Sequence, residues 1–161
     1  MGKALAKVHA IKVPGVVPYY GSRPPWIGEG RPMFITTAEG QYRARDGVTV
    51  TVPRGFVTDL ASTPRWLWSL LPPHGGLALA SLPHDWGYAQ GGKHGLLPKP
   101  WWDALFRDLL AITPDVPRWK AAIAYLGVRY GGKGGWVNGW HPFTPGTVPD
   151  WKSLGEEAAH G

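Results

Sequence analysis

The feature that most constrains the fold is a change in hydrophobic periodicity along the chain. In VTVTV, residues 48–52, valines alternate with threonines, which gives a strand one apolar face. Two other short segments, 33–37 and 40–44, are also predicted as strands. Asp46-Gly47 lies between residues 40–44 and 48–52 and tolerates positive φ angles, which is typical of a hairpin turn. The sequence therefore predicts a small antiparallel sheet near the N-terminus.

Helical spacing replaces this alternation in the second half of the chain. Three helices are predicted, over about 76–90, 99–112 and 116–130. Pro100 and Pro117 suit the first turn of the second and third helices, where a missing N–H has no helical acceptor. Apolar residues recur at helical spacing in these two helices: Trp102, Leu105, Phe106, Leu109 and Leu110 in the second, and Trp119, Ala122, Ile123, Leu126 and Tyr130 in the third.

These elements predict one α+β domain over residues 33–130, in which the small sheet packs on about three helices. Residues 1–32 are rich in Pro and Gly and are predicted as an extended N-terminal arm. Residues 131–161 lose the helical periodicity and are predicted as a C-terminal wrapping tail. Long Pro/Gly-rich arms at both ends favour contacts with neighbouring subunits, so an oligomer is among the expectations.

The composition favours an anionic partner and excludes several kinds of site. Seventeen Lys and Arg residues against eleven Asp and Glu give a net charge of +6, which favours phospholipid headgroups, nucleic acid or wall polymers. The basic residues are scattered rather than clustered, so no specific nucleic-acid partner is predicted. The chain has no cysteine, which excludes disulfides, thiolate metal sites and cysteine nucleophiles.

The sequence predicts neither a signal peptide nor a transmembrane segment. The first residues are basic and mildly apolar, but Pro14 and Pro18 interrupt them, and no stretch approaches eighteen apolar residues. Amide residues are scarce (Gln41, Gln90 and Asn138) and prolines number 17. This bias is typical of a protein from a thermophile, although a GC-rich genome produces the same bias.

Several polar residues on the predicted helices need partners because their neighbours are apolar. His84, Asp85 and Tyr88 lie within one helical turn, so their side chains crowd one side. Antiparallel packing of the first two helices would place Asp103 beside His84. A carboxylate that accepts one imidazole N–H fixes the tautomer, so the other nitrogen can deprotonate a water. His84, Asp103 and Tyr88 are therefore the candidate catalytic residues.

Asp85 is the candidate metal ligand. It would point to a neighbouring position and offer hard oxygen atoms to Ca²⁺, which takes six to eight oxygen ligands. A glycine-rich turn could add backbone carbonyls, and Gly75 and Gly76 of PHGG are nearest in sequence. A calcium ion is accordingly the expected cofactor.

A structural interpretation of the same residues stays open. Asp103 and Arg107 are spaced i, i+4 and could form an ordinary surface ion pair. His84 could be a core histidine whose hydrogen bonds are satisfied, and Tyr88 could serve packing alone.

A second polar segment is GFVTDLASTPR, residues 55–65. Asp59 follows a strand, and an Asx or N-cap turn in which it accepts backbone N–H bonds is the favoured interpretation. The alternative places Asp59 and Arg65 on the rim of the same pocket as His84.

Three blocks of the sequence, VTVTVPRGFVTDLASTPRWLW, LPHDWGY and WWDALFRDLL, occur in this order. Together they resemble a family of small phage and prophage proteins known only as a domain of unknown function. The pattern is roughly VPxGFxTDxASxPR, then HDxxY, then an Asp before an aromatic residue, and the resemblance covers about residues 33–130.

The HDxxY motif and the later Asp also resemble the helix pair of phospholipase A2. This resemblance implies that His84 is the general base, that Asp85 binds Ca²⁺, that Asp103 orients His84 and that Tyr88 hydrogen-bonds Asp103. Bound Ca²⁺ would polarise the ester carbonyl and stabilise the oxyanion. The sequence departs from that family in lacking its glycine-rich calcium loop and its disulfides. Pro83 is a further departure, since it would either kink the helix or begin it.

The leading hypothesis from the sequence is a phage-derived His–Asp hydrolase, calcium-dependent, that cleaves a phospholipid ester. The first alternative is a non-catalytic phage structural or assembly protein of the tail or virion. The second is a cell-wall hydrolase that acts during lysis or penetration of the host. The expected partners are an anionic phospholipid membrane surface or other phage proteins, and the expected location is a host cytoplasm or a virion.

Overall fold

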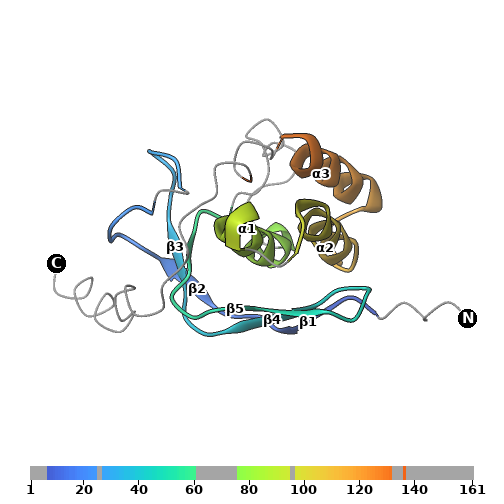
Figure 1. The fold of residues 1–161 in the computed structure, drawn as a ribbon, viewed down its shortest axis with the longest axis horizontal. Coiled ribbons are helices and arrows are strands. Elements are labelled where there is room, and N and C mark those ends of the chain that lie inside the picture. The colour runs from blue at the N-terminus through green and yellow to red at the C-terminus, as the bar shows by residue number, and fades with distance from the viewer. Residues whose placement is uncertain (1–6, 25–26, 61–75, 95–96, 132–135, 137–161) are drawn as a thin grey trace, which may run out of the picture.

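The computed structural model describes residues 7–24, 27–60, 76–94, 97–131 and 136. These residues form two small antiparallel sheets and three helices, so the predicted α+β class is confirmed. In Figure 1 the three helices lie on the same side of the longer sheet, with α1 and α2 nearer to it and α3 farther away. The domain therefore has a sheet layer covered on one face by helices.

The longer sheet has the strand order β1 (His9–Lys12), β4 (Gly40–Arg43) and β5 (Thr49–Val52), and all its pairs are antiparallel. The predicted alternation is confirmed along β5, whose valines are buried and whose threonines are exposed. Val48, the first residue of the predicted strand, precedes β5 and is 39% exposed. The predicted hairpin is also confirmed. Gly47 has a φ of 85°, and the Asp46 carboxylate accepts the backbone N–H of Val48 at 3.0 Å.

The second sheet has the order β2 (Val16–Pro18), β3 (Phe34–Thr36) and β6 (Val57–Thr58). The buried Thr36 joins it to the following turn, because its hydroxyl donates to the Pro53 carbonyl and accepts the Phe56 N–H. Strands β1 and β2 both lie in the predicted N-terminal arm. These two segments pair with strands of the predicted domain, so that β1 joins the longer sheet and β2 joins the second sheet.

The helices are α1 (Gly76–His94), α2 (Lys99–Ala111) and α3 (Arg118–Gly131), which confirms the three predicted helices. Pro83 lies inside α1 and does not begin it. Pro98 occupies the N-cap of α2, and Pro100 lies in its first turn as predicted. Pro117 precedes α3 instead of lying inside it.

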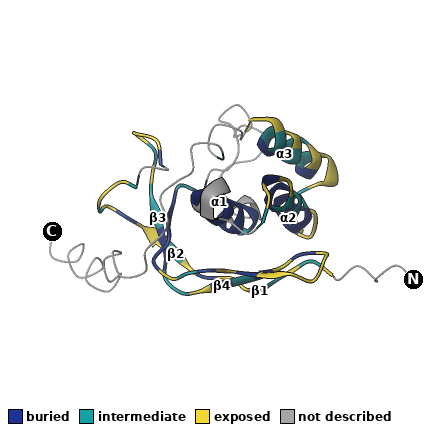
Figure 2. Cartoon of the chain, in the orientation of Figure 1, coloured by how far each residue is buried: buried dark blue, intermediate teal, exposed yellow. Residues whose placement is uncertain are grey.

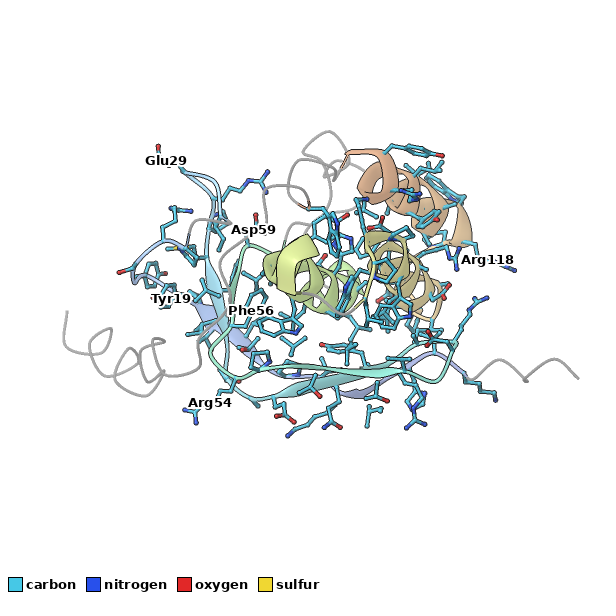
Figure 3. All side chains as sticks on the ribbon, in the orientation of Figure 1. Tyr19, Glu29, Arg54, Phe56, Asp59 and Arg118 are labelled. Atoms are coloured by element: carbon cyan, nitrogen blue, oxygen red, sulfur yellow. The ribbon has the colours of Figure 1, made fainter. Side chains whose placement is uncertain are left out.

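The main core lies between the longer sheet and helices α1 and α2, where the dark residues of Figure 2 face one another. Phe56 lies between the sheets and α1 (Figure 3) and packs edge-on against Trp86 of α1, with ring centroids 5.2 Å apart. Gly87 of α1 faces Trp102 of α2 so closely that an added Cβ would lie 2.2 Å from the indole. Helices α1 and α2 therefore approach each other at this glycine, which fixes the positions of the polar residues on both.

Candidate functional site

The polar residues predicted on α1 and α2 meet at the interface of these helices. The Nε2 of His84 lies 2.9 Å from Oδ1 of Asp103, and the hydroxyl of Tyr88 donates to the same oxygen at 2.9 Å. His84 is 2% exposed and Asp103 is fully buried. The structure thus brings together the three residues proposed as catalytic, and it makes the two hydrogen bonds to Asp103 that the phospholipase resemblance implies.

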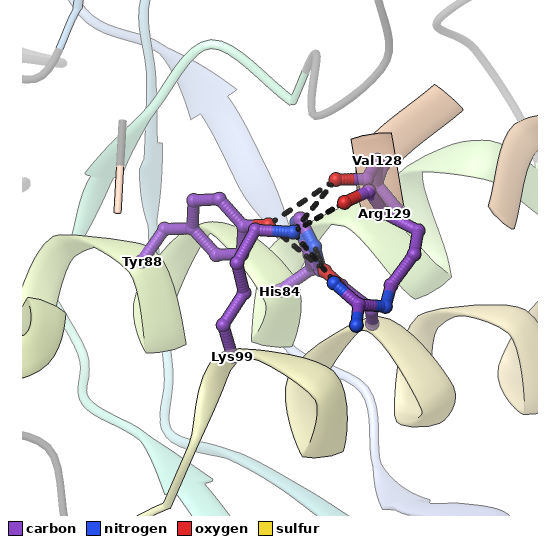
Figure 4. A network of polar contacts seen from close by, with 6 residues as sticks. His84, Tyr88, Lys99, Val128 and Arg129 are labelled. Atoms are coloured by element: carbon purple, nitrogen blue, oxygen red, sulfur yellow. Dashed lines mark hydrogen bonds and ion pairs between the residues drawn. The ribbon is translucent and has the colours of Figure 1, made fainter. Parts of the chain in front are cut away.

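A lysine that the sequence analysis did not identify completes this group. Lys99 Nζ donates to Oδ2 of Asp103 at 2.7 Å and to the carbonyls of Val128 and Arg129 at 3.0 and 3.1 Å (Figure 4). These carbonyls belong to the last turn of α3, where the helix dipole favours a cation. We call His84, Tyr88, Lys99 and Asp103 the Asp103 network. It joins all three helices around one buried carboxylate.

The alternative of a surface pair between Asp103 and Arg107 is wrong. Asp103 is fully buried and its charged partner is Lys99, whereas Arg107 bonds to its neighbour Asp108 at 2.9 Å. The signal for Lys99 was present in the sequence as a Lys and an Asp at i and i+4. Its burial depends on the carbonyls of α3, which local spacing does not reveal.

The tautomer of His84 follows from these contacts. The Asp103 carboxylate is an acceptor, so His84 Nε2 donates, and a neutral ring then keeps its lone pair on Nδ1. Within the described residues, His84 Nδ1 is buried and has no hydrogen-bond partner. The Tyr88 ring lies 4.2 Å and the Phe106 ring 5.1 Å from the imidazole, centroid to centroid, so aromatic side chains fix the plane of the ring.

The electrostatics favour a neutral histidine beside an ionised aspartate. Burial lowers the pKa of His84 below its usual 6.5, and the charge of Lys99 lowers it further, although the bond to Asp103 acts in the opposite direction. Burial alone would raise the pKa of Asp103, but the hydrogen bonds from His84 and Lys99 outweigh burial and lower it. Burial, together with the charge of Asp103, raises the pKa of Tyr88, so its hydroxyl stays protonated.

The proposed metal ligands do not form a calcium site in the part of the chain that is described. Asp85 is half-buried and its Oδ2 accepts the Thr58 hydroxyl at 2.5 Å. Gly76 is the first residue of α1, and Gly75 lies outside the described residues. Across the described ranges, no group of three or more His, Asp or Glu side chains could hold a metal ion. Since Ca²⁺ takes six to eight oxygen ligands, the described residues around Asp85 do not fit it.

Asp59 forms an ion pair with Arg31, with 2.7 Å between Oδ2 and the guanidinium. The Thr58 hydroxyl accepts the Leu60 N–H at 3.0 Å, which closes a side-chain turn at Thr58. An Asx turn at Asp59 would use the N–H of residue 61, which lies outside the described residues. Leu60 has a φ of 53°, an uncommon conformation for a leucine. Arg65, the other predicted rim residue, lies outside the described residues. Thr58 thus connects this turn to Asp85, the residue after His84.

The fold and the Asp103 network define the chain as an α+β domain with a buried His–Asp–Lys cluster. Residues 35–128 match a family described as "Protein of unknown function (DUF1353)", and the chain belongs to this family. The matched segment runs from β3 almost to the end of α3 and includes His84, Tyr88, Lys99 and Asp103. Comparisons with curated proteins and with solved structures gave no match. None of the helices described is long and apolar enough to cross a membrane.

Proposed function

We propose that this chain is a phage-derived hydrolase that cleaves a phospholipid ester, with His84 as its general base. The observation that carries the proposal is that the His84 ring is held by Asp103 on one side and keeps a free lone pair on the other. Its Nε2 bonds Asp103 at 2.9 Å, and its Nδ1 has no partner within the described residues. Buried polar atoms without partners also occur at Tyr42 and Trp102, but neither of those is a base at neutral pH.

The chemistry follows from the protonation states. Neutral His84 takes a proton from water through Nδ1 as the water oxygen attacks the ester carbonyl carbon. Asp103 stabilises the imidazolium that forms, and Lys99 keeps Asp103 ionised. The tetrahedral intermediate then expels the alkoxide, which receives the proton from His84, so that one ester and one water give a carboxylic acid and an alcohol.

The burial of His84 sets a condition on this mechanism. Only 2% of the residue is exposed, so substrate binding must open a path to Nδ1. A phospholipid is the favoured ester because of the phospholipase resemblance and because a net charge of +6 favours anionic headgroups. The proposed step uses no calcium ion, and the assay tests calcium dependence by comparing Ca²⁺ with EDTA.

The test measures fatty-acid release from liposomes of mixed anionic and zwitterionic phospholipid, with Ca²⁺ or with EDTA, over a range of temperatures. Wild type is compared with His84→Gln, and Lys12→Gln at an exposed position of β1 is the surface control. Release by wild type and by the control, with a loss of about 100-fold or more in His84→Gln, is the expected result. Equal release by His84→Gln, or no release by wild type under any condition, would overturn the proposal.

A second candidate function is that of a non-catalytic phage structural or assembly protein. The observation that favours it is Lys99, which neutralises Asp103 and ties it to α3, as expected of a network that holds three helices together. If this is the role of the network, His84→Gln lowers stability by a few kcal/mol. If His84 is catalytic, the variant melts close to wild type or above it.

A further inference from the structure

Helix α3 presents three of its large apolar residues to solvent instead of to the core. Trp119, Leu126 and Tyr130 are 54%, 51% and 70% exposed, and they recur at helical spacing on one face. The opposite face, which packs toward α2, is buried through smaller residues: Ala121, Ala124 and Val128. Figure 2 shows the exposed residues of α3 on its outer side. An apolar stripe of this kind is normally the buried face of a helix, so its exposure calls for a partner.

Basic residues border this stripe, and no acidic residue occurs between Arg118 and Gly131. Arg118 extends from the beginning of α3 (Figure 3), and Arg129 lies near its end. Lys120 Nζ lies 5.5 Å from the centroid of the Trp119 ring, so it borders the aromatic surface itself. We call this surface the α3 outer face; it consists of Trp119, Leu126 and Tyr130 together with Arg118, Lys120 and Arg129.

We propose that the α3 outer face docks the protein on an anionic phospholipid bilayer, with α3 lying in the plane of the headgroups. Tryptophan and tyrosine favour this region because their rings are apolar and their N–H and O–H groups are polar. Lysine and arginine beside them attract anionic headgroups. A bilayer is favoured over an acidic protein because the row places an indole and a phenol between flanking cations, the composition typical of helices that lie at a membrane interface.

Docking through the α3 outer face would bring the Asp103 network close to the bilayer. The last turn of α3 supplies the carbonyls of Val128 and Arg129 to Lys99 on its inner side. The stripe lies on the other side of the same helix, roughly 10 Å away across its diameter. The inference rests on the proposed function for the use of the membrane, since a lipid hydrolase must meet its substrate at a surface.

The test is sedimentation of the full chain with vesicles of ether-linked phospholipids, which contain no ester to hydrolyse. Vesicles with anionic and with purely zwitterionic headgroups are compared at low and high salt. Trp119→Ser/Leu126→Ser/Tyr130→Ser removes the stripe, and Arg118→Gln/Lys120→Gln/Arg129→Gln removes the charges. The matched control is Val13→Ser/Tyr20→Ser, which replaces exposed apolar residues of the N-terminal strand region.

The expected result is salt-sensitive binding of wild type and of the control to anionic vesicles. The charge variant should bind roughly 100-fold more weakly, at about fivefold per cation, and the stripe variant should also lose binding. Binding that both α3 variants retain, or no binding by wild type, would overturn the inference. Self-association of wild type through this face without vesicle binding would also overturn it. Because the lipids resist hydrolysis, binding can succeed even where the proposed hydrolase activity fails.

Discussion

Replacing Lys99 with Met removes the one cation that contacts the buried Asp103 carboxylate within the described residues. The side chain is 9% exposed and the carboxylate is fully buried, so solvent screens their interaction weakly. Lys99 also donates to the carbonyls of Val128 and Arg129, which the variant leaves without this donor. Methionine has a similar length, so the change isolates the loss of charge and hydrogen bonds.

The magnitude follows from the burial of the pair. Breaking a buried ion pair by removing one partner costs about 3–5 kcal/mol, because the remaining charge is left uncompensated. In a chain of 161 residues, each kcal/mol shifts the melting temperature by roughly 2–4 °C, so we expect a decrease of roughly 6–20 °C. The exposed Lys12→Met is the matched control and should change stability by less than about 0.5 kcal/mol.

The pH dependence supplies a second readout. In wild type the pKa of Asp103 is lowered, so its stabilising contribution is present above the ordinary pKa of 3.8 and is lost as the pH falls through the lower folded value. In Lys99→Met the carboxylate lacks its cation, so its pKa rises and protonation relieves the burial. The difference between variant and wild type should therefore be largest near pH 7 and shrink on acidification.

The assay is urea unfolding of wild type, Lys99→Met, Asp103→Asn and the double variant, followed by circular dichroism at several pH values. The double variant should lose less stability than the sum of the two single variants, because it contains no unpaired buried charge. Lys99→Met with wild-type stability at pH 7, or strict additivity in the double variant, would refute the buried ion pair.

Three further results are expected. Burial lowers the pKa of His84, so its stabilising contribution is complete above about pH 6.5. Below that pH the free energy of unfolding should fall by up to about 1.4 kcal/mol per pH unit. Urea unfolding at pH 7.5 and 5.5 should show this loss in wild type but not in His84→Gln. Gly87→Ala places a Cβ 2.2 Å from the Trp102 indole and should lower the free energy of unfolding by about 1–3 kcal/mol. An unchanged melting temperature would disprove this close approach. Tyr88→Phe removes a hydrogen bond to the buried carboxylate and should cost about 1.5–3 kcal/mol. The proposed hydrolysis uses His84 and Asp103, so the variant should retain it, and the reverse pattern would give Tyr88 a catalytic role.

The fold was largely predictable because its main elements have strong local patterns. The alternation in β5 and the helical spacing of α2 both follow from one buried face. Strands β1 and β2 were not predicted, since Pro14, Gly15 and Pro18 interrupt their segment. Both strands lie at sheet edges, where proline is tolerated because one side of an edge strand makes no ladder bonds. Their existence depends on pairing with distant strands.

The candidate site was predictable where neighbouring helices alone determine it. A short connection between α1 and α2 makes these helices neighbours, so the contact of His84 with Asp103 could be expected from the sequence. Lys99 could not, because a lysine at a helix start is normally exposed, and its burial requires the end of α3. The outward direction of Trp119 was equally inaccessible, since the apolar period of a helix does not state which side meets the core.

The proposed function requires that Asp103 hold His84 as a neutral base and that a lipid ester reach its Nδ1. Long-range ¹H–¹⁵N NMR of the histidine side chains tests it most directly, recorded at pH 7 with and without a short-chain anionic phospholipid below its micelle concentration. We expect the ring of His84 to be neutral with its proton on Nε2, and its Nδ1 resonance to shift on addition of the lipid. A proton on Nδ1, or an Nδ1 resonance that saturating lipid leaves unmoved, would contradict the claim and assign the Asp103 network to holding the fold.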